Sequence, residues 1–378
     1  MQNIKRVFLK FKIIFFILSL FIAIFIFSEE ISQGFKKGFL LCLNVLIPSL
    51  FPFMVLSTFI SIFSFSKRFD KICNLVTKFL FGLPGYTALT IFLGLIGGYP
   101  TGALGISDLL KNELITENQA KRMSLFLVNS GPAFVITAVG LKMLHNFEIG
   151  IVLFLSQTLS AIILGLISKY TFKEIGQKSN NFKIKGQLNF SDSFVKSVKS
   201  SSQSIFNMCS FVVLFSAFME IIRSKMILNY IMKILKILKI KQEIGLSSII
   251  SFFEITSGCY TACELKVPLW IISFFLSFGG LCVHMQIFSC LEGLSFSKKL
   301  FFLFRVLHGM ISILIFYLLL PFFNCSLQTF NTYFKGNLTC DFSSSHMEII
   351  FLSLCFLISL TKDSINFMKK ECFDWIAV

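Results

Sequence analysis

The sequence GGYPTG at residues 97–102 ends an apolar run that starts at Leu89. A second break, EITSG at residues 254–258, ends another apolar run that starts at Ile249. Both segments are too short, and too interrupted by glycine or proline, to cross a bilayer as one continuous helix. Two such segments at corresponding places in the two halves of a chain point to the binding site of a transporter. The pair therefore predicts a membrane transporter that is built from two repeats.

The composition agrees with a membrane protein. Of the 378 residues, 55% are hydrophobic and only 14% are charged, whereas a soluble domain carries about a quarter charged residues. The apolar sequence is long enough for about eight spans of roughly 20 residues each. The net charge of +16 comes from basic residues in short segments between apolar runs. This distribution indicates topology signals and contacts with anionic lipids, and it argues against nucleic-acid binding.

The sequence contains no pattern of a known catalytic or metal site. The motifs of zinc proteases, α/β-hydrolases, P-loop proteins and dinucleotide-binding enzymes do not occur. Most of the 11 cysteines lie inside apolar runs, and no His or Cys pair follows Cys259 and Cys263 at a metal-ligand spacing. We therefore expect no enzymatic activity, no metal and no other cofactor.

We expect an all-α polytopic fold with about eight transmembrane helices, an inverted repeat and two re-entrant hairpins. The expected spans are residues 8–27, 39–63, 123–143, 149–170, 205–222, 267–291, 300–320 and 347–361, and the expected hairpins are residues 83–110 and 245–263. The chain then divides into an N-terminal signal-anchor helix (1–38), a first repeat (39–170), a basic cytoplasmic linker (171–204), a second repeat (205–320) and a C-terminal loop and helix (321–378).

The distribution of basic residues gives an orientation. The positive-inside rule places the basic N-terminus and the basic linker inside. The basic segment 223–241 then falls outside, against the rule. Either an amphipathic helix on the membrane surface or an error in the predicted topology explains this segment.

Glu254 is the sharpest single candidate, because an acid at membrane depth is by default a functional residue. Its expected role is coupling to a proton or cation, or a hydrogen bond to the substrate; a structural ion pair is the alternative. The substrate-binding residues that we expect are Gly98, Tyr99, Pro100, Thr101 and Gly102 at the first break, Glu254, Thr256, Ser257 and Gly258 at the second, and Asn129, Ser130, Gly131, Gly279 and Gly280 in neighbouring spans.

Four segments together resemble a known family. They are IPSLFPF at 47–53, GYPTGA at 98–103, NSGPAF at 129–134 and EITSG at 254–258. They look like the YlbJ-type sporulation integral membrane proteins, whose paired nucleoside-recognition Gate domains are similar to those of spore maturation proteins and concentrative nucleoside transporters. The resemblance runs from about Leu40 to Leu320. The second-half counterpart of the SGP motif, FGG at 278–280, lacks the proline.

The resemblance implies a role in endospore formation. It implies a transporter that moves dipicolinate, a small aromatic dianion, from the mother cell across the outer forespore membrane by alternating access. The partners are then this anionic metabolite and anionic lipids, with the coupling ion and oligomeric state open. Two alternatives remain at this point: a transporter of nucleosides or other small metabolites, and a membrane scaffold for spore assembly that transports nothing.

Overall fold

The computed structural model describes residues 24–62, 67–172, 189–294 and 296–323, together with four isolated positions near the N-terminus, and no strand occurs among them. The first described helix is continuous from Ser28 to Ile62. It consists of α2 (Ser28–Leu41), a π-helical turn η1 (Cys42–Leu46) and α3 (Ile47–Ile62). The expected span 39–63 is thus the second part of a longer helix. The expected spans 8–27, in large part, and 347–361, entirely, lie outside the described residues.

The rest of the chain forms two series of helices. The first series is α4 (Lys67–Phe81), η2 (Gly85–Thr87), α5 (Ala88–Ile96), α6 (Tyr99–Lys111), α7 (Glu117–Phe126), the π-helix η3 (Ala133–Met143) and α8 (Phe147–Thr171). The second series is α9 (Phe190–Arg223), α10 (Lys225–Ile237), α11 (Gln242–Phe253), α12 (Ile255–Glu264), α13 (Leu269–Phe278), α14 (Gly280–Cys290), α15 (Lys298–Leu319) and η4 (Leu320–Phe322).

The two series follow the same order. In each, a long helix (α3 or α9) is followed by a short helix (α4 or α10), and then by a pair of helices with a break between them (α5–α6 or α11–α12). A second broken pair (α7–η3 or α13–α14) and a long helix (α8 or α15) complete each series. Each of the two expected hairpins contains two packed helices with a break between them, α5 with α6 and α11 with α12.

Four segments among the described residues are long and apolar enough to cross a membrane: Phe147–Thr171, Phe190–Arg223, Leu269–Cys290 and Lys298–Phe322. Each overlaps an expected span, which supports a multi-pass membrane protein. The second begins well before the expected residue 205, because the helix extends through a serine-rich stretch. The expected span 123–143 is divided into α7 and η3 by the five non-helical residues 127–131, just before Pro132.

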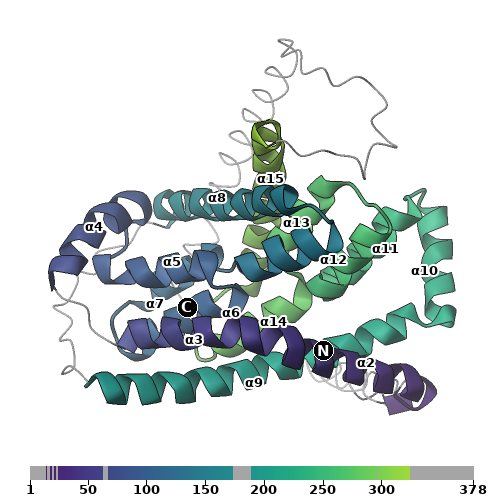
Figure 1. The fold of residues 1–378 in the computed structure, drawn as a ribbon, viewed down its shortest axis with the longest axis horizontal. Helices are drawn as coiled ribbons and strands as arrows, with labels where there is room; N and C mark the ends of the chain where they lie inside the picture. The colour runs from purple at the N-terminus through teal and green to yellow at the C-terminus, as the bar shows by residue number, and fades with distance from the viewer. Residues whose placement is uncertain are drawn as a thin grey trace, which may run out of the picture.

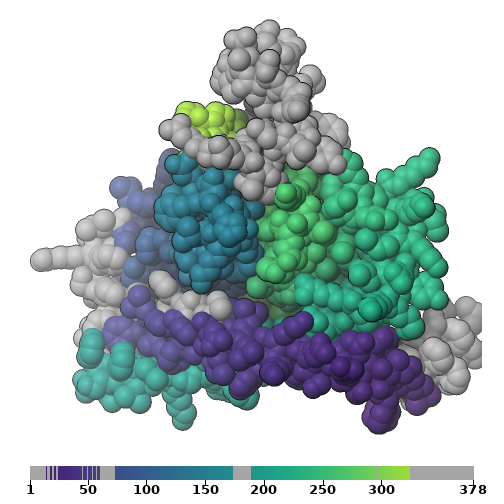
Figure 2. Space-filling view, turned by 45° about the vertical axis from the view of Figure 1, so that its right-hand side comes forward, coloured from purple at the N-terminus to yellow at the C-terminus, as the bar shows by residue number. Residues whose placement is uncertain are grey.

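Helices α3, α8 and α9 lie roughly along one direction, α15 runs across it, and the short helices α4 and α10 stand at its two ends (Figure 1). The α2–α3 helix and α9 run side by side along the lower edge, while α8 lies on the opposite edge. Helix α4 is at the left end and α10 at the right end. In the space-filling view, α2 and α3, in purple, extend along most of one side of the molecule (Figure 2). The helix breaks lie between these layers.

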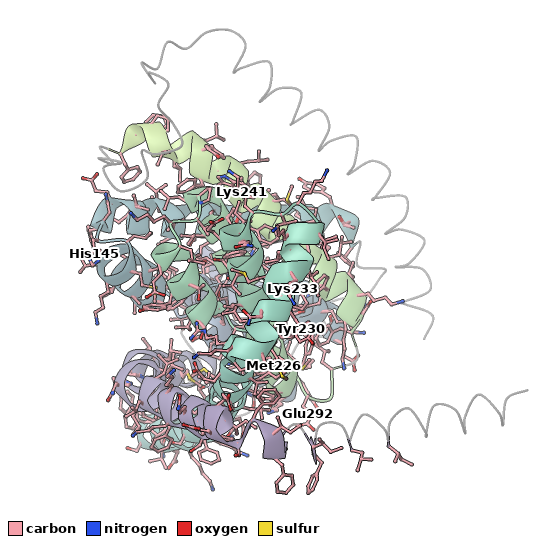
Figure 3. All side chains as sticks on the ribbon, turned by 90° about the vertical axis from the view of Figure 1, so that its right-hand side faces the viewer. His145, Met226, Tyr230, Lys233, Lys241 and Glu292 are labelled. Atoms are coloured by element: carbon pink, nitrogen blue, oxygen red, sulfur yellow. The ribbon has the colours of Figure 1, made fainter. Side chains whose placement is uncertain are left out.

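Helix α10 is the basic segment that the positive-inside rule did not explain. It stands at the surface with Met226, Tyr230 and Lys233 on its outer side (Figure 3), and Leu235 is its buried residue. The ammonium group of Lys233 lies 5.8 Å from the centre of the Tyr230 ring. Basic and apolar side chains that share one exposed helix are typical of a helix in the membrane interface. This observation supports the first of the two explanations.

Candidate functional site

The first break is a sharp turn made by glycine. Gly98 has φ +99°, a backbone conformation that favours glycine, and Pro100 follows in the first turn of α6, where its missing N–H costs no hydrogen bond. The two arms of the hairpin touch through Gly94 and Gly102, and a Cβ on Gly102 would overlap the carbonyl oxygen of Leu127. Glycine at residue 102 is therefore needed for close packing of α6 on the α7 break.

The second break places an acid at the start of α12. Both carboxylate oxygens of Glu254 accept hydrogen bonds from backbone N–H groups, one from Thr256 (2.8 Å) and one from Ser257 (2.6 Å). Glu254 is only 3% exposed. Its charge is thus offset by the positive end of its own helix. The arms of this hairpin also touch at small residues, since a Cβ on Gly258 would overlap Ser251.

The break between α7 and η3 is held by amide and hydroxyl side chains. The Asn129 side chain donates to the carbonyl oxygens of Gly94 (3.2 Å) and Phe126 (2.9 Å), so it joins this break to the first hairpin. Gln157 of α8 donates to the Ser130 carbonyl oxygen at 2.5 Å. Gly98 and Gly131 are in close contact. A Cβ added to Gly131 would lie 3.3 Å from the amide nitrogen of Gly98. The first two breaks of the chain therefore meet.

The break between α13 and α14 reaches the same place. Gly279 and Gly280 both have positive φ (+89° and +77°). Tyr99 donates a hydrogen bond of 2.7 Å to the carbonyl oxygen of Leu276, at the end of α13, and the Ser130 hydroxyl bonds to the Tyr99 hydroxyl. The buried Tyr99 side chain thus links the first hairpin to both neighbouring breaks.

Two buried side chains of α15 lie beside the place where these breaks meet, and the sequence did not single them out. Arg305 is fully buried and donates to the carbonyl oxygens of Val128 (2.6 Å) and Leu125, at the end of α7. His308 lies 3.0 Å from the Ser277 carbonyl oxygen and 2.9 Å from that of Gln157. No carboxylate forms an ion pair with Arg305 among the described residues. Its partners are instead backbone carbonyls at the negative end of a helix and the His308 ring, whose Nδ1 lies 3.2 Å from the guanidinium group.

A cavity of about 100 Å³ lies where the breaks meet. It is lined by Gly98, Tyr99, Pro100, Gly131, Glu254 and Thr256 among the predicted residues, and by Leu46, Leu50, Ile96, Gly97, Pro132, Ala133, Phe134, Met208, Val212, Ile255, Cys282, Val283 and Gln286. The other predicted residues lie behind this layer. They are Thr101, Gly102, Asn129, Ser130, Ser257, Gly258, Gly279 and Gly280, several of which hold the breaks together as described above.

The electrostatics of the cavity follow from the helices that end at it. The first turns of α6, η3, α12 and α14 all contribute lining residues. Glu254 caps α12, whereas the cap residues of α6, η3 and α14 (Gly98, Pro132 and Gly279) make no side-chain hydrogen bond to their helices. The N-terminus of a helix carries a partial positive charge and favours anions. Within the described part of the chain, no cluster of three or more metal-ligating side chains is present.

Comparison with known proteins gives one informative match. The sporulation integral membrane protein YlbJ of Bacillus subtilis (strain 168) is 24% identical to this chain over 348 residues, and the match covers 84% of each protein. No family model and no solved structure matches the chain. Together with the apolar helices, the match confirms the resemblance that the motifs indicated and the location in a membrane.

Proposed function

We propose that this chain, a YlbJ-type integral membrane protein, carries a small organic anion across a membrane during sporulation, and that the cavity at the helix breaks is its substrate site. The observation that carries this proposal is the convergence of four helix N-termini on one cavity, three of them without a side-chain cap. At these three N-termini no side chain accepts a hydrogen bond from the first backbone N–H groups. An anion in the cavity would accept those bonds instead. The proposal includes no catalytic step and no cofactor.

The lining of the cavity favours an anion whose charged groups are attached to an aromatic or other apolar body. Leu50, Ile96, Phe134 and Val283 contribute apolar walls, and the hydroxyl of Thr256 is one of the few polar groups. Small-molecule sites generally combine an apolar lining with a few placed polar groups. Dipicolinate has this chemistry. We therefore propose it as the substrate, moved from the mother cell across the outer forespore membrane, as the family resemblance implies.

The mechanism that we propose is alternating access between two repeats of opposite orientation. The same order of elements occurs twice, and the amphipathic helices α4 and α10 lie at opposite ends of the molecule (Figure 1). An inverted repeat accounts for this placement, because corresponding interface helices then lie on opposite membrane faces. In this proposal the described residues contribute eight membrane-inserted segments, four long helices and four broken pairs, and the expected spans 8–27 and 347–361 add to them.

The present cavity corresponds to a closed state. Its volume of about 100 Å³ is smaller than the roughly 300 Å³ at the lower end of small-molecule sites. Binding of the proposed anion therefore requires the hairpin tips to separate. A site that enlarges and closes around its ligand is what alternating access needs.

The test is uptake of labelled dipicolinate by liposomes that contain the purified protein. Thr256→Val removes a hydroxyl that lines the cavity while it keeps the side-chain volume. Thr101→Val is the matched control, since this hydroxyl bonds to the Gly97 carbonyl oxygen across the break (3.0 Å) and Thr101 does not line the cavity. A hydrogen bond to a charged group contributes about 1.5–3 kcal/mol. We therefore expect Thr256→Val to raise the half-saturating concentration by roughly 10- to 150-fold.

Other solutes and gradients make the assay decisive. Uptake is measured under proton, sodium and counter-anion gradients, and uridine is tested beside dipicolinate. Uptake of uridine alone would replace the anion with a nucleoside as substrate. A folded protein that takes up neither solute under any gradient would overturn transport and leave a scaffold role. Equal loss in Thr256→Val and Thr101→Val would remove the cavity from the proposal.

A further inference from the structure

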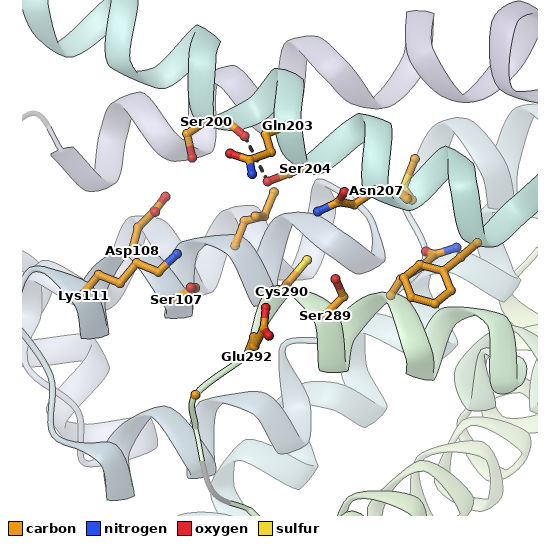
Figure 4. Close-up of a pocket in the computed structure, with 15 residues that line it drawn as sticks. Ser107, Asp108, Lys111, Ser200, Gln203, Ser204, Asn207, Ser289, Cys290 and Glu292 are labelled. Atoms are coloured by element: carbon orange, nitrogen blue, oxygen red, sulfur yellow. Dashed lines mark hydrogen bonds between the residues drawn. The ribbon is translucent and has the colours of Figure 1, made fainter.

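A second, larger cavity lies beside the hairpin-tip cavity. It is a cleft of about 410 Å³ between α6, α9 and α14, and its lining is mostly polar (Figure 4). The hydroxyl, amide and charged residues that line it are Ser107, Asp108, Lys111, Ser200, Gln203, Ser204, Asn207, Gln286, Ser289 and Glu292. Asp108 and Lys111 lie at one end of the cleft in Figure 4, and Asn207 lies farther along it. We call this cavity the polar cleft.

The polar cleft reaches membrane depth. Its residues on α9 follow helical spacing and run from the serine-rich first part of this helix into the apolar part, the expected span 205–222, where Asn207 and Met208 lie. Hydroxyl and amide side chains at this depth are costly against lipid and generally face protein or water. The neighbouring residue Phe206 is 73% exposed and does not line the cleft. Helix α9 thus presents an apolar face to its surroundings and a polar face to the cleft.

The polar cleft and the hairpin-tip cavity are adjacent. Met208 of α9 and Gln286 of α14 line both. Both side chains are buried, with 4% and 5% of their surface exposed, and Gln286 donates to the Cys282 sulfur (3.3 Å). The two cavities are therefore separated by a wall that includes these two side chains, one of which is a flexible methionine.

We infer that the polar cleft is the water-filled passage through which a small hydrophilic solute reaches the hairpin-tip cavity from one face of the membrane, with Met208 and Gln286 as the closed constriction. The inference rests on the proposed transport function, which gives the passage its purpose. The labelling test below requires no transport. The face is the one that bears Lys111 and Glu292. By the positive-inside rule it is the cytoplasmic face, since Lys111 ends α6 there and the basic linker that leads into α9 belongs to that side.

The test compares two adjacent positions on α9. Asn207→Cys places a thiol in the polar cleft, and Phe206→Cys places one on the exposed apolar face. Each full-length variant, with its native cysteines, is treated with a membrane-impermeant, negatively charged methanethiosulfonate. The reagent is applied to intact expressing cells and to inverted membrane vesicles, and labelling of each site is read by mass spectrometry. We expect labelling of Asn207→Cys in inverted vesicles at least tenfold faster than in cells, and little labelling of Phe206→Cys from either side.

Native cysteines test the constriction in the same samples. Cys290 lines the polar cleft, while Cys282 lines the hairpin-tip cavity beyond Met208. We expect Cys282 to resist the reagent in the wild type and to become reactive in Met208→Ala. No labelling of Asn207→Cys from either side, or labelling equal to that of Phe206→Cys, would overturn the passage. Labelling of Asn207→Cys from the cell exterior alone would overturn its assignment to the cytoplasmic face.

The labelling does not depend on any solute, so the two proposals fail separately. One-sided labelling without uptake of any tested solute would leave the passage standing and overturn transport. Uptake that persists when Asn207→Cys is fully labelled, although the modified thiol fills the polar cleft, would leave transport standing and overturn the passage.

Discussion

Replacing Glu254 by glutamine separates two roles for this buried acid. The carboxylate accepts one N–H bond with each oxygen, from Thr256 and from Ser257, so a glutamine amide has an oxygen for only one of them. A hydrogen bond to a charged group contributes about 1.5–3 kcal/mol. The loss of one bond should thus make opening of the first turn of α12 roughly 10- to 150-fold more favourable.

Hydrogen exchange of the protein in lipid nanodiscs measures this opening directly. We expect faster exchange in the peptide that contains Thr256 and Ser257, with little change elsewhere. Glu264→Gln is the matched control, because Glu264 is exposed at the other end of the same helix. Unchanged exchange in Glu254→Gln, together with uptake that no longer responds to a proton or cation gradient, would refute the capping role and favour the coupling role that the sequence suggested.

Three further substitutions test the packing of the breaks. Gly102→Ala should abolish the monodisperse, folded protein in size-exclusion chromatography, because its methyl group would overlap the Leu127 carbonyl; a wild-type yield with normal uptake would contradict this. Tyr99→Phe loses the buried bond to Leu276 and should reduce stability against denaturant by about 1–3 kcal/mol, so an unchanged unfolding midpoint would show that the bond contributes nothing. Arg305→Lys keeps the charge but not the fork that binds two carbonyls; we expect a lower melting temperature, and full stability would mean that charge alone suffices.

The sequence predicted the breaks of the two hairpins, because their signals are local, but it treated 123–143 and 267–291, which are also broken, as single spans. The turn at Gly98 needs a positive φ and the next turn accepts Pro100, so the pattern and its structural cause lie in the same few residues. At the second break the local signal is the acid, since Glu254 caps the new helix α12 and Gly258 lies inside that helix. Patterns of this kind are visible without knowledge of the neighbouring helices.

What the sequence did not predict depends on distant partners. Arg305 is, by sequence, one basic residue near the start of the expected span 300–320, yet it is fully buried and bonds to Leu125 in the last turn of α7, a different helix of the fold. No pattern within α15 announces that contact, because the acceptors are backbone carbonyls, which every residue has. Gly102 likewise looked like part of a binding turn, and its close contact with Leu127 becomes evident only when α6 and the α7 break are placed together.

The two hairpin tips differ in a way that bears on how the cavity opens. The cap of α12 is internal: Glu254 bonds to N–H groups of its own helix, so this tip can shift as a unit and keep those bonds. The first tip is fastened to other segments, because the Tyr99 hydroxyl bonds to Leu276 and Asn129 bonds to the Gly94 carbonyl. Moving that tip breaks buried hydrogen bonds, each worth about 1–3 kcal/mol when a partner is left unpaired. In the proposed transport cycle, enlargement of the cavity should therefore cost less at the second hairpin tip than at the first, where α12 is tied to α9 only farther along, by the bond from Arg223 to Thr261 (3.1 Å).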